Sequence, residues 1–346
     1  MLDIVTIAVC AVISGAESWV EVAQWGRIKQ AWLADWLDLP HGMPTHDTFG
    51  RVFARIDPAQ FEAGFLRWVQ TATQSAEPEV IALDGKTIRR SGDRRTGQRP
   101  LHLVSAWASE RRLVLAQAAV DTKDNEITTL PSLLDRLDLT GQIVTIDAMG
   151  CQREIAGQIV GGGGDYVLAL KANQPDLHED VIDCFAMAEQ ADASARTVEK
   201  DHGRVEVRVC ETIHDPAVIA WLDAEQRWPG LRTIARVAAI RQVGGQDPTT
   251  SVRYYLSSLP GDARPIAEAV RSHWGIENSL HWVLDMAFRE DESRTRTGDS
   301  AQNLAVLRKL ALTLIQQDRA RTVGVKASRL RAGWDTGYLL ALLGAS

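Results

Sequence analysis

The sequence has few cysteines, no long hydrophobic run and no excess of positive charge. Its four cysteines include no Cys-x-x-Cys pair and no metal-ligand spacing, so they are predicted to be small core residues in a reducing cytosol. The apolar stretch 4–13 has about half the length needed to cross a bilayer. It also lacks the basic start and the cleavage site of a signal peptide. We therefore expect a cytoplasmic protein with no membrane partner.

Glycine and charge exclude less. The run Gly161–Gly164 lacks the spacing of a phosphate-binding loop and is predicted to be a turn between a helix and a strand. The formal net charge of -7 argues mildly against a nucleic-acid partner, but a net charge averages over all faces of a protein. Segment 86–99 has six basic residues against Asp93, and segment 308–331 has seven against Asp318. Each segment is either a site for an anionic partner or ordinary solvated charge.

The chain's 346 residues suggest two domains, or one domain with insertions. Residues 1–78 are predicted to be a helical domain that begins with a buried helix. The chain starts almost inside this helix without a capping residue, which suggests that a short segment precedes it. A Pro/Gly-rich turn at 39–44 between short helices resembles a helix-turn-helix, and a plain helical cap is an equal alternative.

From residue 79 the pattern becomes α/β. Three β-like runs (80–85, 101–108 and 112–121) are followed by a helix at about 127–137, a strand at 142–149, a helix from 151, a strand at 165–172 and a helix from 175. This order predicts a mixed sheet with helices on its faces, spanning 79–189. Period-two alternation predicts an antiparallel β insertion at 190–259. Helices return at 260–318, including one from Pro265 to Phe288, and 319–346 is a basic, less regular tail.

Two aspartates carry the chemical argument. Asp84 ends the apolar run VIALD and Asp147 ends IVTID. A buried carboxylate is costly unless something pairs with it, and rigid carboxylate oxygens suit Mg²⁺. Since the first and fourth strands can lie side by side, we expect the two aspartates to meet at a two-metal site for phosphoryl transfer.

A third acid is needed, and Glu277 on a polar helix side is the candidate, with Trp274, Leu280 and Val283 expected on the other side. Gly275 would permit close approach of another backbone or of DNA. A solvated surface glutamate remains an alternative, as do Asp285 and Glu292 as the third acid. A zinc site formed by His273, Glu277 and His281 competes, but residues at i, i+4 and i+8 diverge around a helix.

Several motifs together resemble a known family. They are IALDGKTIRR, LHLVSAWA, KDNEIT, IVTIDAMGCQ, GGDYVLALKANQP, HGRVEVR and HWGIENSLHWVLDMAFREDESR. In order and over nearly the whole chain, they resemble the H-repeat-associated (ISAs-type) transposases of bacterial insertion sequences, which belong to the DDE group with an RNase H-like core. The resemblance implies an RNase H-like fold with a β insertion before the catalytic glutamate.

The resemblance also implies a function. Asp84, Asp147 and Glu277 would be the metal-binding and catalytic triad, with Mg²⁺ or Mn²⁺ as cofactor. The expected activity is phosphodiester hydrolysis at element ends and strand transfer into target DNA. Double-stranded DNA is the expected partner, with a homodimer or larger synaptic assembly at the bacterial nucleoid. A metal-dependent nuclease of the same fold and a catalytically inactive DNA-binding relative are the alternatives.

One departure from the wider group concerns the residues around the third acid. The pattern Y-x(2)-R-x(3)-E-x(6)-K is often found there, and this chain has Val270, His273 and Leu284 in place of the tyrosine, arginine and lysine. His273, Arg271 or Lys171 are the expected substitutes. The candidate DNA-binding residues are Lys86, Arg89, Arg90, Lys171, Asn173, His202, Arg204, Arg271, His273, Trp274 and Asn278. For Lys86 a salt bridge to a carboxylate is an equal alternative.

Overall fold

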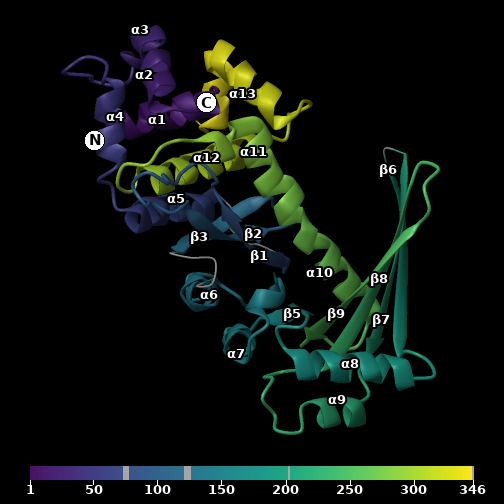
Figure 1. The fold of residues 1–346 in the computed structure, drawn as a ribbon. Coiled ribbons are helices and arrows are strands. Elements are labelled where there is room, and N and C mark those ends of the chain that lie inside the picture. Colours follow the sequence, from purple (N-terminus) through teal and green to yellow (C-terminus); the bar gives the residue numbers. More distant parts are fainter. Residues whose placement is uncertain (73–77, 121–125, 202, 345–346) are drawn as a thin grey trace.

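A computed structural model describes residues 1–72, 78–120, 126–201 and 203–344. A nine-stranded sheet runs through the molecule in the order β3-β2-β1-β4-β5-β9-β8-β7-β6. Figure 1 shows helices α1–α5 and α11–α13 on one side of the β1–β3 part of the sheet, and α6 and α7 on the other side. The sheet strands are β1 Val80–Thr87, β2 His102–Ala108, β3 Leu113–Val120, β4 Ile143–Ile146, β5 Asp165–Leu170, β6 Ala193–Asp201, β7 Arg204–Ile213, β8 Thr233–Val243 and β9 Thr249–Ser257.

The first five strands form the RNase H-like core. Strands β1, β2 and β3 are an antiparallel meander, and β4 joins β1 in parallel, with β5 parallel to β4. The helices α6 (Glu126–Leu134) and α7 (Arg153–Gly161) cross between the parallel strands, as a crossover connection requires. The predicted neighbourhood of the first and fourth strands is confirmed, with Leu83 opposite Ile146.

The strands after α8 (Pro175–Met187) continue the core sheet. Strand β9 pairs antiparallel with β5, and β8, β7 and β6 follow outward in an antiparallel series. The alternating pattern predicted β7, β8 and β9, but not β6 or the short helix α9 (Pro216–Leu222). Figure 1 shows β6, β7, β8 and β9 as a long arm, here called the β arm, beside α10.

Helices from both ends of the chain share one apolar core against the sheet. Side chains of α1, α12 and the last two helices pack with Ala82, Trp107 and Val114. The last segment was expected to be less regular, but it forms α13 and α14. This expectation failed because Arg329 is buried and donates hydrogen bonds to backbone oxygens of Val12, Ala16 and Ala287. The helices are α1 Leu2–Ile13, α2 Trp19–Ile28, α3 Gln30–Leu33, α4 His46–Phe53, α5 Pro58–Ala72, α10 Ala263–Gly275, α11 Trp282–Phe288, α12 Ser300–Gln317, α13 Val325–Trp334 and α14 Thr336–Leu342.

The helix predicted from Pro265 to Phe288 is present, but its middle is a π-helix at Ile276–His281. Such π segments occur frequently at functional sites. Leu280 is buried and Trp274 is 38% exposed, so the prediction that these two side chains share one helix side is wrong. A Cβ on Gly275 would lie 4.0 Å from Trp107 Nε1, so no described protein atom approaches this glycine closely.

Candidate active site

Three carboxylates from three elements line one pocket of about 210 Å³. Asp84 lies within β1, and Asp147 follows the last residue of β4 and caps a 3₁₀ turn by accepting a hydrogen bond from Met149 N at 3.0 Å. Because Leu83 is opposite Ile146 in the parallel pair, the next residue on each strand is an aspartate at the same edge of the sheet. Glu277 comes from the π-helix that packs across this edge.

The carboxylates perturb one another. Burial and then the charge of Asp84 raise the pKa of Asp147. The same two causes, in the same order, raise the pKa of Glu277. Burial also opposes ionisation of Asp84, but the neighbouring His281 and His273 outweigh burial, so the pKa of Asp84 is lowered. The site therefore keeps Asp84 ionised and concentrates negative charge, which a bound cation would relieve.

Two histidines from the same helical stretch flank Asp84. His281 Nε2 lies at an ion-pair distance of 3.3 Å from Asp84 Oδ2, but neither nitrogen of this buried ring makes a hydrogen bond within the described parts of the chain. His273 Nδ1 lies 3.0 Å from Thr145 Oγ1, and burial lowers the pKa of His273 despite the opposing charges of Asp84 and Asp147. Each ring is thus directed to a partner on the sheet.

The competing prediction of a zinc site on this helix is wrong. Among residues 1–72, 78–120, 126–201 and 203–344, no three histidine, cysteine, aspartate or glutamate side chains are grouped to hold a single ion. The physical reason is that the rings of His273 and His281 lie against Thr145 and Asp84 rather than converging with Glu277.

The carboxylates nevertheless suit hard divalent cations. Mg²⁺ is usually bound through one or two carboxylates, with water and substrate phosphate completing its shell, and a two-ion site shares its ligands between the ions. Such a site does not need three protein ligands around one point. Asp84, Asp147 and Glu277 supply oxygen donors from relatively fixed elements into a single pocket, so the residues present fit this cofactor.

Five of the eleven predicted DNA-binding residues fall into two groups. Lys171, His273 and Trp274 line the carboxylate pocket. The other group is engaged elsewhere: Lys86 Nζ lies 2.7 Å from Asp285 and 3.1 Å from Asp291, and Arg271 pairs with Glu199 on β6. The salt-bridge alternative therefore holds for Lys86, and Arg271 is already partnered. Lys171 is an exposed cation that lines this pocket.

The remaining candidates lie around these pockets or outside the described residues. Asn173 donates its amide to Ala148 O, and Asn278 donates to Trp274 O at 3.0 Å. Arg89 lies in the loop after β1, largely exposed beside Asp291, and the carbonyl of Arg90 in the same loop accepts hydrogen bonds from Arg296. Arg204 on β7 lies near Glu206. His202 lies outside the described residues.

Both alternative third acids have cationic partners. Asp285 holds Lys86 by two hydrogen bonds of 2.7 and 2.9 Å, and Glu292 is half-exposed and pairs with Arg289. Neither residue lines the pocket that contains Asp84 and Asp147. Geometry therefore favours Glu277 over both.

The second basic segment, 308–331, does not present all of its cationic side chains at the surface. Arg308, Lys309 and Arg329 are each at most 3% exposed, so these three side chains are unavailable to an external anion. Lys309 Nζ contacts Ser105 Oγ at 2.8 Å and Gln117 Oε1 at 2.5 Å, and burial lowers its pKa to about 8. They hold the helices to the sheet instead.

Three features of the site escaped sequence reasoning. Arg253 lines the carboxylate pocket, and its guanidinium lies 4.7 Å from the centre of the Trp274 ring. Under β1, His102 Nε2 lies 2.5 Å from Glu126 Oε1 in a buried pair. Gly85 leaves room for this pair, because a Cβ there would lie 2.6 Å from Glu126 Oε1. The adjacent motif letters DGK and KDNEIT were the available signal.

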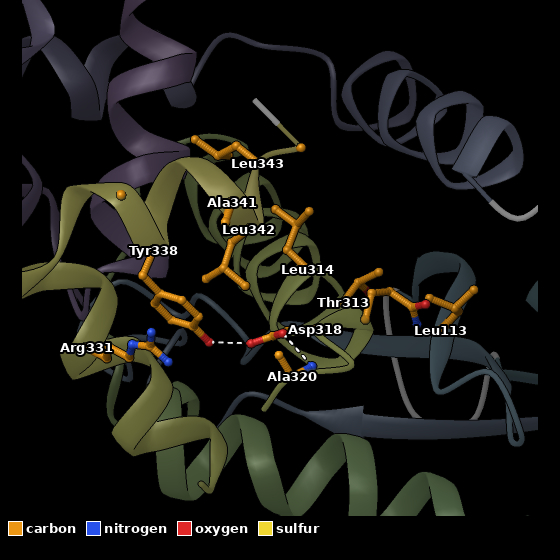
Figure 2. A pocket seen from close by; sticks show the side chains of 13 residues that line it. Leu113, Thr313, Leu314, Asp318, Ala320, Arg331, Tyr338, Ala341, Leu342 and Leu343 are labelled. Carbon is orange, nitrogen blue, oxygen red and sulfur yellow. Dashed lines mark hydrogen bonds between the residues drawn. The ribbon is translucent and has the colours of Figure 1, made fainter. Parts of the chain in front are cut away.

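A roomier cavity lies away from the carboxylates. It encloses about 780 Å³ between α12 and α14. Figure 2 shows leucine side chains on one part of its wall and a hydrogen bond from Tyr338 to Asp318, which measures 2.8 Å. Asp318 is its lone lining carboxylate among the described residues, so this cavity does not have the chemistry of the three-carboxylate pocket.

An antiparallel meander followed by parallel strands, with acids at their shared edge, defines the RNase H-like class. Comparison with known families agrees: residues 75–314 match the family described as Transposase DDE domain, and residues 1–69 match its associated domain, DDE_Tnp_1-associated. The chain belongs to the DDE transposase family, in its H-repeat-associated branch.

Two relatives and one solved structure illustrate the similarity. The Escherichia coli O157:H7 protein named "Putative transposase YncI" is 39% identical over 99% of this chain and 88% of its own length. The Escherichia coli K12 protein named "H repeat-associated putative transposase YhhI" is 36% identical over 99% of this chain and 92% of its own length. The piggyBac transposase synaptic complex with hairpin DNA is 10% identical, with a TM-score of 0.44 over 99% of this chain and 72% of that chain. That last likeness is too weak to carry an argument.

None of the helices in the described ranges has the length and apolar character needed for a membrane span. The apolar α1 instead packs in the protein core, with Ile7, Cys10 and Ile13 fully buried.

Proposed function

We propose that this protein cleaves phosphodiester bonds at the ends of a DNA element and joins those ends to target DNA, with Mg²⁺ or Mn²⁺ as cofactor. The observation that carries the proposal is the meeting of Asp84, Asp147 and Glu277 in one pocket, although 193 residues separate the first from the last (277 − 84). Family membership supports the same reaction class.

Asp84, Asp147 and Glu277 would hold the metal. The bound ions would supply Lewis-acid stabilisation of the charge that develops on the phosphate oxygens. His281 is buried and lies 3.3 Å from Asp84 Oδ2, so it would restrain this carboxylate. The protein's main contribution is thus positioning and charge stabilisation, as in other phosphoryl transfers.

Two cations of the chain face the phosphate region. Lys171 directly follows β5 and Arg253 comes from β9, and both line the carboxylate pocket. They are suited to bind the nonbridging oxygens of the phosphates that flank the scissile bond, with Arg offering a planar fork and Lys a point charge. They occupy the role expected of the residues that this chain lacks around Glu277.

The substrate is double-stranded DNA in this proposal, and the active species is a homodimer or larger assembly. Joining the two ends of an element to a target requires chemistry at two positions, and each chain described here has one carboxylate pocket of this kind among its described residues. The exposed arginines of loop 88–100, such as Arg94 and Arg95, would add phosphate contacts away from the site.

The test is a cleavage assay with DNA that contains the inverted repeats flanking the gene. Wild-type protein should nick these ends when Mg²⁺ or Mn²⁺ is added, and should join them to a second duplex. Asp84→Asn and Asp147→Asn should each lose both activities while keeping DNA binding, because phosphate contacts come from other residues.

A matched control is Asp138→Asn, which makes the same change at an exposed position. It should cleave at the wild-type rate. Cleavage without joining would favour a nuclease, and metal-independent DNA binding without cleavage would favour an inactive relative. Near-wild-type cleavage by either folded site variant would refute the proposed site.

A further inference from the structure

A second groove adjoins the carboxylate pocket between α10 and the β arm. It encloses about 450 Å³ and is lined by side chains from β7, β8, β9 and α10. We call it the arginine groove, because five arginines line it: Arg204, Arg208, Arg241, Arg253 and Arg271.

The strand register explains why these arginines share one face. Arg208 is opposite Ala239 and Glu206 is opposite Arg241 on β8, and Val237 on β8 is opposite Arg253 on β9. Residues two apart on a strand point to the same face. The β arm therefore presents its alternating positions to α10, which contributes Arg271 from the facing side.

The groove carries an excess of positive charge. Five arginines and Glu206 line it, and Glu199 at its rim pairs with Arg208 and Arg271. No carboxylate in the described ranges lies within ion-pair distance of Arg241 or Arg253. This local charge contrasts with the chain's formal net charge of -7, so the acidic average does not describe this face.

The groove is continuous with the site. Arg253, Tyr255, Val270 and Trp274 line both the groove and the carboxylate pocket. Trp274 is 38% exposed at this junction, with the Arg253 guanidinium over its ring. A positively charged groove with an aromatic side chain is the composition by which proteins bind single-stranded nucleic acid without reading its sequence.

We propose that the arginine groove binds the backbone of single-stranded DNA that continues from the scissile phosphate along the β arm. This inference rests on the proposed function of the carboxylate site. Arg241 and Arg253 contact successive phosphates, and the partly exposed Trp274 ring contacts a base at the junction. The contacts are to phosphates and to a ring face, so they tolerate any sequence.

The experiment compares two fluorescently labelled duplexes of identical sequence, one blunt and one with a single-stranded extension of about six nucleotides, a length within the range that single-strand grooves hold. Affinity is measured by fluorescence anisotropy with the full-length wild type, the double variant Arg241→Gln/Arg253→Gln and the control Arg196→Gln. Arg196 is exposed on β6 opposite Val209, one residue out of phase with Arg208, so it lies on the other face of the arm.

The extension should tighten wild-type binding by about tenfold, the effect of one stacked base and its phosphates. The double variant should bind the extended and the blunt duplex with equal affinity, and Arg196→Gln should keep the gain. Loss of two single-strand phosphate contacts should also reduce the salt slope for the extended DNA by about 1.4.

Two results would overturn the inference: no gain from the extension in the wild type, or an unchanged gain in the double variant. An unchanged gain with weaker binding of both duplexes would assign the groove to duplex DNA. Failure of the proposed function is separable, because it would appear as absent metal-dependent cleavage of end-containing DNA while the anisotropy comparison still reports on the groove.

Discussion

The substitution Gly85→Ala probes the link between the carboxylate site and the buried pair beneath it. Gly85 follows Asp84 on β1, and an added Cβ would lie 2.6 Å from Glu126 Oε1 and 2.7 Å from His102 Nε2. These atoms cannot move independently, since they are 2.5 Å apart and the other ring nitrogen of His102 lies 2.7 Å from Thr87 Oγ1.

The expected cost follows from that packing. Forcing a methyl group into a well-packed core costs about 1–3 kcal/mol, and leaving a buried hydrogen-bonding group without its partner costs about 1–3 kcal/mol. Replacing glycine with alanine also lowers the conformational entropy of the unfolded chain, which stabilises the folded protein by only about 0.4–1 kcal/mol. We therefore expect Gly85→Ala to lower the free energy of unfolding by about 2 kcal/mol, with a larger loss if Glu126 leaves His102.

Urea unfolding followed by circular dichroism measures this change. The control is Gly161→Ala at the end of α7, where a Cβ would have no neighbour within 4 Å and should be neutral or stabilising. In a Glu126→Ala background the cost of Gly85→Ala should shrink, because the closest contact is gone. A Gly85→Ala protein as stable as the wild type would refute the packing argument.

Three further predictions concern two buried cations, Lys309 and Arg329, and the partly buried Lys86. Burial lowers the pKa of Lys309 from 10.5 to about 8, so between these pH values the unfolded chain binds a proton that the folded chain does not. The free energy of unfolding should therefore rise with pH by about 3 kcal/mol relative to Lys309→Met. Equal pH profiles of the two proteins in urea titrations would contradict this. Arg329→Met removes the hydrogen bonds that Arg329 donates to three backbone carbonyl oxygens and should lower the free energy of unfolding by about 3–5 kcal/mol. An unchanged urea midpoint would show that Arg329 does not hold the last segment in its helical structure. Lys86→Met leaves Asp285 without its cation and leaves Asp291 with Arg89 alone. It should cost about 1–3 kcal/mol without altering the salt slope of DNA binding; a slope reduced by about 1 would instead make Lys86 a phosphate contact.

Local patterns were sufficient to predict the part of the site formed by the sheet. Asp84 and Asp147 follow apolar runs, and strand order alone implied that their strands adjoin. Glu277 was harder to place, because its position depends on a helix that returns across the sheet edge after the insertion and on a π segment that has no simple sequence signature.

Pairings between distant residues were beyond sequence reasoning. Lys86 meets Asp285 across 199 positions, and a lysine in a strand has no local feature that distinguishes an internal ion pair from a phosphate contact. Arg253 alternates with apolar and polar residues like any strand position, and its role depends on α10 crossing the β arm. The basic residues Arg308 and Lys309 indicated a charged surface, yet tertiary packing buries both.

The measurement that tests the central claim most directly is cleavage and binding of end-containing DNA by third-acid variants in Mg²⁺. Glu277→Gln should bind DNA ends with near-wild-type affinity and show no cleavage, while Glu292→Gln and Asp285→Asn retain measurable cleavage. Normal cleavage by Glu277→Gln, together with an inactive Glu292→Gln or Asp285→Asn, would contradict the proposed triad.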